Sequence, residues 1–235
     1  LDSIGTGAFK ECNILNNIHL PNSLQKIGDA AFYNCYCVNS LSIGDGLKSI
    51  GDSAFYKISS FLTSITVGDG NSVYDSRNNC NALIHTATNT LLIGCENTVI
   101  PNGVEVIGAS AFYNSHLPSI DIPNTVKIIE NSAFYLCGNL QSIVIPNSVE
   151  EISWNAFYLC YSLSSAEFGD GVTTIGNQAF MYTSLKDVVL GKSVRTIASE
   201  AFYGCNLLET IDLPIGLEEI GYRAFSYCTA LRSFT

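Results

Sequence analysis

The sequence predicts a repeat solenoid, a fold in which short stacked coils share one elongated core. Three features indicate this fold class: a dipeptide that recurs at a fixed interval, apolar residues at fixed positions in each unit, and turn residues between them. Seven of the eight intervals between successive Ala-Phe dipeptides are 22 or 23 residues long, a period typical of solenoids. The nine phenylalanines of these dipeptides lie at positions 9, 32, 55, 112, 134, 157, 180, 202 and 225.

The composition describes an ordered, acidic chain. Its 235 residues are 47% hydrophobic and 14% charged, and 11 Lys and Arg against 21 Asp and Glu give a net charge of −10. A chain of this length and composition can bury a substantial core, which argues against disorder and against a disulfide-stapled miniprotein. The basic residues are scattered, so we expect no nucleic-acid partner, and no apolar run is long enough for a membrane span or forms a signal peptide.

Each unit is predicted to begin with a short strand and a corner. Ile143 and Ile145 are two residues apart, so their side chains lie on one face of an extended chain. The corner that follows has turn chemistry, either Pro-Asn as at 146–147 or Gly-Asp-Gly at 44–46, 68–70 and 169–171. Equivalent strand pairs are Ile120/Ile122 and Ile211/Leu213.

The second half of each unit reads Val-x-x-Ile, often Gly, and then Ala-Phe-Tyr-x-Cys. The Ile ends a second extended piece, and the Ala-Phe segment suits one helical or 3₁₀ turn that closes the coil. Stacking at the strand spacing of about 4.8 Å places each Ile and each Phe over its equivalent in the next coil. About ten coils at this spacing give a rod or shallow arc of about 50 Å.

This unit resembles the BspA-like leucine-rich repeats of bacterial surface proteins, whose 23-residue pattern contains Leu-x-x-Ile-x-Ile-Pro, Ile-Gly and Ala-Phe. The resemblance covers essentially the whole chain and implies a single leucine-rich repeat solenoid over residues 1–235, a right-handed superhelix of short parallel β-strands. It also implies a cell-surface or extracellular location and a role in adhesion or protein binding, without catalysis. Residues that depart from the pattern are expected to perturb single coils: Glu130, Ser153 and Ala198 at the turn glycine, and Ala166 and Phe168 at the strand pair.

One interval of 57 residues interrupts the array, and the residues that leave the pattern are 68–98. Within them, 81–85 and 90–94 are apolar, and the four residues between them favour a β-hairpin insertion. Two arrangements are open: an elongated coil whose hairpin packs on the solenoid edge, or a distinct binding protrusion, since insertions on rigid arrays often carry recognition.

The cysteines are predicted to be buried free thiols. Six of the nine lie three residues after the repeat Phe, where other units have Ile58, Ser115 or Thr183, so this position is a small buried slot. Cys80 and Cys95 bracket the hairpin and are the one pair for which a disulfide is considered. The six slot residues are Cys12, Cys35, Cys137, Cys160, Cys205 and Cys228.

We expect no catalytic site, no metal site and no cofactor. Metal-ligand spacing of Cys and His is missing, and neither a nucleophile elbow nor a phosphate-binding Gly-rich loop occurs. The Gly-Asp-Gly corners and the oxygen-rich segment from Asp69 to Asn79 lack the spacing of calcium motifs and are interpreted as solvated turns.

A row of tyrosines directly after the repeat Phe is the best candidate binding surface. The rings are expected to stack along an edge of the solenoid, either as cover for the core or as a contact strip, because Tyr is enriched in interfaces. Tyr113, Tyr135 and Tyr158 lie on three successive units, and the hairpin joins the array nearby. The predicted binding residues are therefore Tyr113, Tyr135, Tyr158, His116 and His85.

The sequence thus predicts a non-catalytic interaction module that binds a protein or glycan on a host or neighbouring cell. A structural spacer and a non-catalytic arm of a larger enzyme are the alternatives. The chain is also expected to be a segment of a longer array, because both ends fall inside a unit and neither supplies a polar cap.

Overall fold

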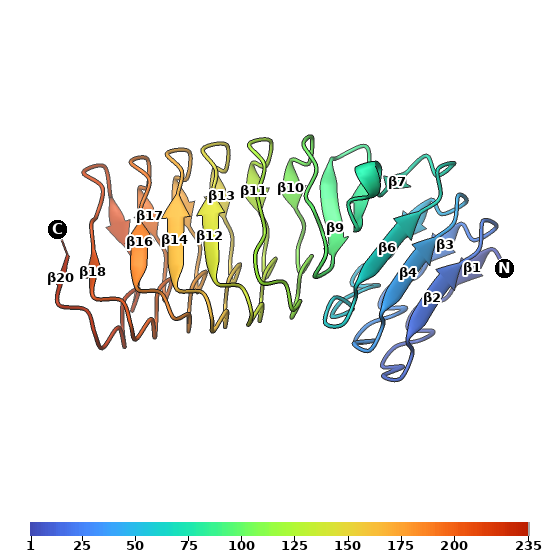
Figure 1. Cartoon of the computed structure of the whole chain (residues 1–235), viewed down its shortest axis with the longest axis horizontal. Helices are drawn as coiled ribbons and strands as arrows, with labels where there is room; N and C mark the ends of the chain where they lie inside the picture. The colour runs from blue at the N-terminus through green and yellow to red at the C-terminus, as the bar shows by residue number, and fades with distance from the viewer. Residues whose placement is uncertain (235) are drawn as a thin grey trace.

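The computed structural model describes residues 1–234, and these form the predicted β-solenoid of about ten turns (Figure 1). Coil follows coil from the N-terminus to the C-terminus. Within the described residues the one helical segment is the 3₁₀ turn Arg77–Asn79. Repetition along the sequence therefore corresponds to repetition along one axis in space.

The first strand of a coil pairs in parallel with the first strand of the next. Apolar and polar side chains alternate along these strands, as in β2, where Ile18 and Leu20 are buried and His19 is exposed. The three sheets consist of β2 (Asn17–Leu20), β4 (Ser40–Ile43) and β6 (Ser64–Val67); β12 (Ser142–Ile145), β14 (Ser165–Phe168) and β16 (Asp187–Val189); and β18 (Thr210–Ile211) and β20 (Ser233–Phe234).

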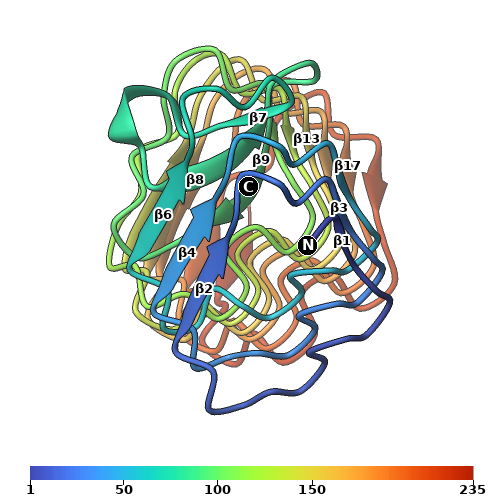
Figure 2. The ribbon, with the colours of Figure 1, turned by 90° about the vertical axis from the view of Figure 1, so that its right-hand side faces the viewer.

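The second strands lie on another side of the coil (Figure 2). Their isoleucines are in register, so that Ile107 pairs with Ile129 and Ile129 with Ile152. One sheet contains β1 (Ser3–Ile4), β3 (Lys26–Ile27) and β5 (Ser49–Ile50). The other runs in the order β19 (Glu219–Ile220), β17 (Thr196–Ile197), β15 (Thr174–Ile175), β13 (Glu151–Ile152), β11 (Ile128–Ile129), β10 (Val106–Ile107), β9 (Thr90–Gly94), β8 (Ala82–His85) and β7 (Tyr74–Asp75).

Three details of the coils differ from the prediction. Ile120 and Ile122 are buried as expected, but the segment around them forms no strand; Pro118 precedes it and has no N–H to donate to a neighbouring coil. Ala166 and Phe168 do not perturb their coil, because the Phe168 ring packs edge-on against Phe180 and β14 pairs regularly with β12 and β16. Nor do the residues that replace the turn glycine disturb the ladder, since their N–H groups donate to the preceding coil at 2.9 Å: Glu130, Ser153 and Ala198.

The Ala-Phe segments are chains of tight turns without helix. In the unit around Phe112, Ser110 and Asn114 have φ of 58° and 55°, values incompatible with a right-handed helix. Between these turns, the N–H groups of Ser110, Phe112 and Asn114 donate to carbonyl oxygens of the next coil at 3.0, 2.8 and 2.7 Å. The Ala-Phe side of the solenoid therefore has its own ladder of hydrogen bonds between coils.

The core is a series of stacked side chains, as the repeat predicts. The Phe134 and Phe157 rings are parallel within 5° with centroids 5.0 Å apart, and both side chains are fully buried. This Phe ladder has two parts, Phe9 to Phe55 and Phe112 to Phe225. The buried residues accordingly form two clusters, and the segment 68–98 contributes residues to both.

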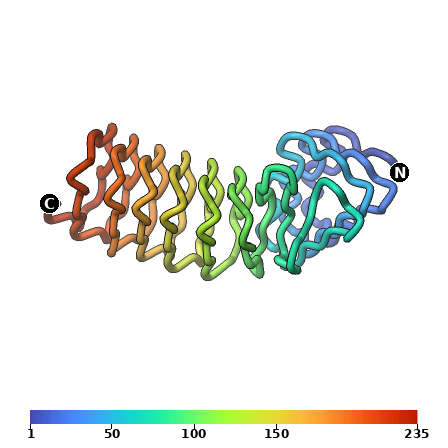
Figure 3. The backbone as a smooth tube through the Cα atoms, turned by 90° about the horizontal axis from the view of Figure 1, so that it is seen from above, coloured from blue at the N-terminus to red at the C-terminus, as the bar shows by residue number. Residues whose placement is uncertain are grey.

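The predicted hairpin, β8 and β9, lies between these two cores. Leu83 and Ile93 pack into the N-terminal core, whereas Ile84 and Leu91 pack into the C-terminal core. Strand β9 pairs in parallel with β10, so the hairpin is part of the stack and neither rests on the solenoid edge nor protrudes from it. The coils on its two sides run in different directions (Figures 1 and 3).

Candidate functional site

The tyrosine row is continuous across the junction between the two parts of the solenoid. The rings of Tyr113, Tyr135 and Tyr158 stack at centroid distances of 4.9 and 5.0 Å, so the structure brings these three predicted residues together. Tyr56 lies 5.2 Å from Tyr113 and carries the row into the N-terminal part. The row comprises Tyr33, Tyr56, Tyr113, Tyr135, Tyr158, Tyr182, Tyr203 and Tyr227.

Most rings of the row are half-buried. Tyr113 is the most covered, with 9% of its surface exposed, and burial raises the pKa of its hydroxyl. Lys57 Nζ lies 5.5 Å from the Tyr56 ring centroid and 5.1 Å from that of Tyr113, so a cation covers the two rings at the junction. The row therefore serves as cover for the core and also presents aromatic edges to solvent.

The two predicted histidines lie near the junction but are not equivalent. His116 is exposed, and its ring packs edge-on against Phe61 at 5.2 Å, a contact between the two parts of the solenoid. His85 ends β8; its Nδ1 is 2.8 Å from Thr88 Oγ1, and its ring centroid is 5.6 Å from that of Tyr74. It therefore lies in the cleft described next, away from the stack of Tyr135 and Tyr158.

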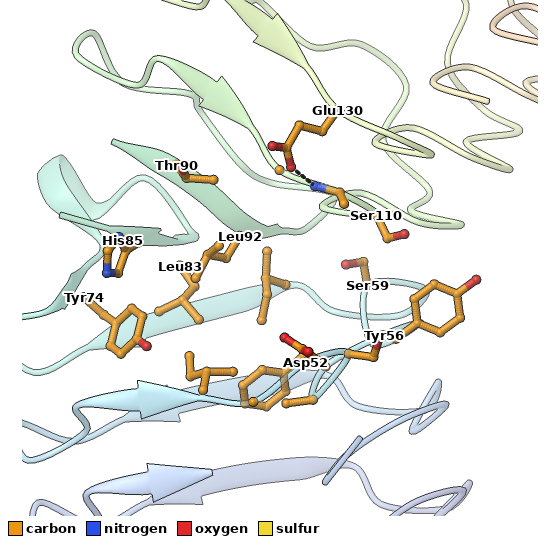
Figure 4. Close-up of a pocket in the computed structure, with 18 of the residues that line it drawn as sticks. Asp52, Tyr56, Ser59, Tyr74, Leu83, His85, Thr90, Leu92, Ser110 and Glu130 are labelled. Atoms are coloured by element: carbon orange, nitrogen blue, oxygen red, sulfur yellow. Dashed lines mark hydrogen bonds between the residues drawn. The ribbon is translucent and has the colours of Figure 1, made fainter. Parts of the chain in front are cut away.

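The junction contains a cleft of about 620 Å³ between the last N-terminal coil and the hairpin (Figure 4). One wall is formed by residues 50–56, and the other by the hairpin with residues 108–110 and Glu130. Its floor is apolar, with Phe55, Leu83 and Ile93 among its residues. Tyr56 belongs both to this cleft and to the tyrosine row, so the two surfaces are continuous.

The charged groups of the cleft are acidic. Asp52 and Glu130 lie on opposite walls (Figure 4), and the lining contains no Lys or Arg within the described residues. Glu130 Oε2 accepts a hydrogen bond from the Ala109 N–H at 2.8 Å, which fixes this carboxylate at the rim. Such a cleft favours a ligand with an apolar body and a positive group.

The sequence did not indicate Asp52, Tyr74 and Glu130 as members of a site. The available signal was the long interval without an Ala-Phe dipeptide, which implies that one coil has no closing turn. In the sequence, Glu130 is distinguished only as a replacement of the turn glycine. The side chains that meet here come from three separate segments, and their meeting depends on how the hairpin packs.

The cysteines of the repeat slot are structural. Cys137 Sγ donates to the Phe112 carbonyl at 3.0 Å, and Cys160 Sγ to that of Phe134 at 3.1 Å. Burial raises the pKa of both thiols, so neither is a reactive thiolate. All nine cysteines lie within the described residues and are free thiols, including Cys80 and Cys95.

The corner carboxylates and amides hold neighbouring coils together. Asp170 Oδ1 accepts the Lys192 N–H at 3.0 Å, and Asn147 Oδ1 accepts the Asp170 N–H at 2.8 Å. Asn71, from the oxygen-rich segment, donates its Nδ2 to the Gly44 carbonyl at 2.9 Å. In the part of the chain that the structure describes, no three metal-binding side chains are close enough to hold an ion. The structure also contains no apolar helix long enough to cross a membrane within residues 1–234.

Comparisons with known proteins agree with this architecture. A leucine-rich repeat protein of Bacteroides ovatus is 28% identical with a TM-score of 0.73, over 100% of this chain and 58% of that one. One from Eubacterium ventriosum is 22% identical with a TM-score of 0.70, over 96% of this chain and 80% of that one. The pneumococcal vaccine antigen PcpA is 19% identical with a TM-score of 0.51, over 100% of this chain and 53% of that one. This chain thus spans little more than half of the first and third of these proteins.

A comparison with curated protein sequences finds no match. The sequence model of the BspA type leucine rich repeat region, in contrast, matches six copies within residues 1–91 and 86–209. These matches span most of the chain. The chain therefore belongs to the BspA-type leucine-rich repeat family.

Proposed function

We propose that this chain is a non-catalytic protein-interaction module of a bacterial protein at the cell surface or outside the cell. Its contact surface is the part of the tyrosine row next to the junction, with Tyr113, Tyr135 and Tyr158 at its centre, His116 nearby and His85 in the adjoining cleft. The observation that carries the proposal is the continuous row of ring contacts across the junction, in which Tyr56 packs tilted against Tyr113 and Tyr113, Tyr135 and Tyr158 stack. Stacked tyrosines offer a rigid, amphipathic surface that loses little rotamer entropy on binding.

The absence of catalysis is part of the proposal, and the use of the polar groups supports it. The slot thiols donate hydrogen bonds within the core, and the corner carboxylates accept backbone N–H groups. His85 and His116 lie in different environments, one against Tyr74 and one against Phe61. These groups act in the fold, which leaves surface contact as the function best supported.

The partner is a protein, or a glycan, on a host or neighbouring cell, and adhesion is the role that the family resemblance favours. Surface location rests on the same resemblance, and likeness in fold to the pneumococcal vaccine antigen PcpA accords with it. Labelling intact cells of the source bacterium with a membrane-impermeant biotin reagent tests the location. Recovery of the full-length protein only after cell lysis would contradict it.

Pull-down from host-cell and extracellular-matrix extracts tests the contact surface. The wild-type chain should retain a partner that the triple variant Tyr113→Ser, Tyr135→Ser, Tyr158→Ser loses, provided that circular dichroism shows both to be folded. The matched control replaces exposed tyrosines outside the row by Ser: Tyr36, Tyr161 and Tyr222. Equal retention of the partner by both triple variants would place the contact surface elsewhere. Failure of the wild-type chain to retain any partner would favour a structural spacer.

A further inference from the structure

The junction omits one Ala-Phe turn from the stack. Residues 56–110 contain no Ala-Phe dipeptide, and the hairpin supplies strands there but no closing turn. In regular coils, three backbone N–H groups of this turn donate hydrogen bonds to carbonyl oxygens of the next coil. In the coil around Phe32, the donors are the N–H groups of Ala30, Phe32 and Asn34, and each bond is 2.8 Å long. The coil around Phe55 has the same turn but is followed by the cleft.

The ladder of hydrogen bonds is therefore open at the Phe55 turn and partly open on the opposite wall of the cleft. Within the described residues, the N–H groups of Ser53, Phe55 and Lys57 have no partner, although their equivalents in the regular coils do. On the opposite wall, the Ala111 carbonyl accepts from Gly94 N and Ser59 Oγ, at 2.9 and 3.1 Å. The flanking carbonyl of Ala109 is unused among the described residues.

Strand β5 also ends its sheet at this cleft. It pairs with β3 on one side, and no strand of the described chain pairs with its other side. The first-strand sheet ends differently, because side chains of the insertion cap β6: Asn81 Oδ1 accepts from Ile65 N at 3.3 Å, and Ser76 Oγ donates to Ile65 O at 3.5 Å. At β5 the Tyr74 hydroxyl reaches the Ile50 backbone, and Ile50 lines the cleft.

Unpaired backbone groups beside an apolar floor are the requirement for recognition of an extended peptide by strand addition. We propose that the junction cleft binds an extended segment of a partner protein, which pairs with the open edge of β5 and the turn Ser53–Lys57 and places a basic side chain between Asp52 and Glu130. The carboxylates of the rim select this charge, and Lys57, at the end of the same turn, holds its ammonium over the Tyr56 and Tyr113 rings. This inference rests on the proposed interaction function and names the chemistry of its partner.

A random-peptide library displayed on phage and selected against the folded chain tests the proposal. Selected peptides should share Lys or Arg at one position between apolar or β-branched residues. The double variant Asp52→Asn, Glu130→Gln should bind the selected peptide about tenfold more weakly. The matched control Asp121→Asn, Glu167→Gln removes the same charge from exposed positions outside the cleft and should bind as the wild type does. N-methylation of the peptide backbone at alternate residues should abolish binding, because strand addition uses its amide groups.

Amide chemical shifts show where the peptide lies. On addition of the selected peptide, the N–H resonances of Ser53 and Phe55 should move, whereas those of Phe134 and Phe157, which donate to the next coil, should not. The proposal is overturned if no basic consensus is selected, if the cleft variant binds as tightly as its control, or if the shifts occur elsewhere. Selection of acidic peptides, or self-association of the chain through the cleft, would also overturn it.

The outcome for the cleft is separable from that for the tyrosine row, because Tyr113, Tyr135 and Tyr158 do not line the cleft. If the extract partner still binds the Asp52 and Glu130 variant and no peptide is selected, the interaction function stands and the cleft proposal is wrong. If peptides are selected but the triple tyrosine variant retains every partner, the cleft proposal stands and the tyrosine surface is wrong.

Discussion

The ring of Tyr56 lies 5.2 Å from the ring of Tyr113, centroid to centroid, although one complete repeat turn is missing between them. Their phenylalanine neighbours, Phe55 and Phe112, belong to separate ladders. The two parts of the solenoid therefore touch at the tyrosine row and diverge at the core, where the hairpin is inserted. This geometry produces both the cleft and the change in coil direction at the hairpin. That change in direction therefore depends on the residues that fit between the two cores.

Gly94 is one of these residues, and we predict that Gly94→Ala destabilises the junction. A Cβ on Gly94 would lie 2.0 Å from Cε1 of Phe112, a buried ring with little room to move. Overpacking of this kind costs about 1 to 3 kcal/mol in free energy of unfolding, measurable by urea denaturation. Gly138→Ala is the control, because its nearest atom is 3.8 Å away, and it should change stability little. Equal stabilities of the two variants would contradict this packing.

Phe157→Ala should be among the most destabilising single changes. The Phe157 side chain is fully buried and stacks on Phe134 and Phe180 at 5.0 and 4.9 Å. Removal of such a ring costs about 3 to 5 kcal/mol in free energy of unfolding. Phe61→Ala, at a ring with 50% of its surface exposed, should cost far less. A loss below about 1 kcal/mol for Phe157→Ala would show that the ladder does not carry the core.

The stacks of equivalent side chains could be predicted because each stack consists of one residue type at one fixed position of the repeat. The nine Phe positions suffice to place every Phe over the next, and the same holds for Ile107, Ile129 and Ile152. The row is longer than predicted because two units with Met181 or Ser226 directly after the repeat Phe still contribute a tyrosine. Tyr182 and Tyr227, with φ of 57° and 61°, join the row one residue later.

The position of the hairpin was not predicted, although the sequence contains a signal for it. Leu83-Ile84 and Leu91-Leu92-Ile93 are apolar without alternation, a pattern typical of strands buried on both faces. A hairpin resting on the solenoid edge would alternate polar and apolar residues. The cleft itself could not be predicted, because Asp52 and Glu130 meet across it only through the packing of the hairpin between the two cores.

The slot thiols should be protected in the folded protein. Cys137 and Cys160 are fully buried, and their Sγ atoms donate to carbonyl oxygens of the preceding coil. Iodoacetamide labelling followed by mass spectrometry should leave both unmodified until denaturant is added. Cys12 and Cys37 are half-buried and should react first. Rapid native labelling of Cys137 or Cys160, or a disulfide at either, would contradict the assignment.

The same thiols predict that stability falls at alkaline pH. Burial raises the pKa of Cys137 and Cys160 above the ordinary value of 9.0, so above about pH 9 the unfolded chain loses these protons while the folded chain keeps them. The stabilising effect is complete below that pH and decreases as pH rises. Urea denaturation at pH 8 and pH 10.5 should show this loss. The double variant Cys137→Ala, Cys160→Ala should show a smaller one, and an identical pH dependence would refute the thiol contribution.

Ser115 occupies the same slot, and its hydroxyl is buried without a hydrogen-bond partner. Five of the slot cysteines donate to the Phe carbonyl of the preceding coil, as Cys137 does to Phe112, whereas the coil before Ser115 lies across the junction. An unsatisfied buried hydroxyl costs about 1 to 3 kcal/mol of folding stability. Ser115→Ala removes this penalty but also loses the packing contacts of the oxygen atom, so the free energy of unfolding should rise by about 1 kcal/mol.

Thr183→Val, which replaces the hydroxyl and keeps the γ-methyl, is the matched control at the same position of a regular coil. The Thr183 hydroxyl donates to the Phe180 carbonyl at 2.9 Å, so its removal should lower the free energy of unfolding by about 1 kcal/mol. The two substitutions remove a hydroxyl from equivalent buried positions and should therefore have opposite signs in urea denaturation. If both destabilise the chain to the same extent, Ser115 must have a partner in solution, and the open ladder at the junction would not extend to this slot.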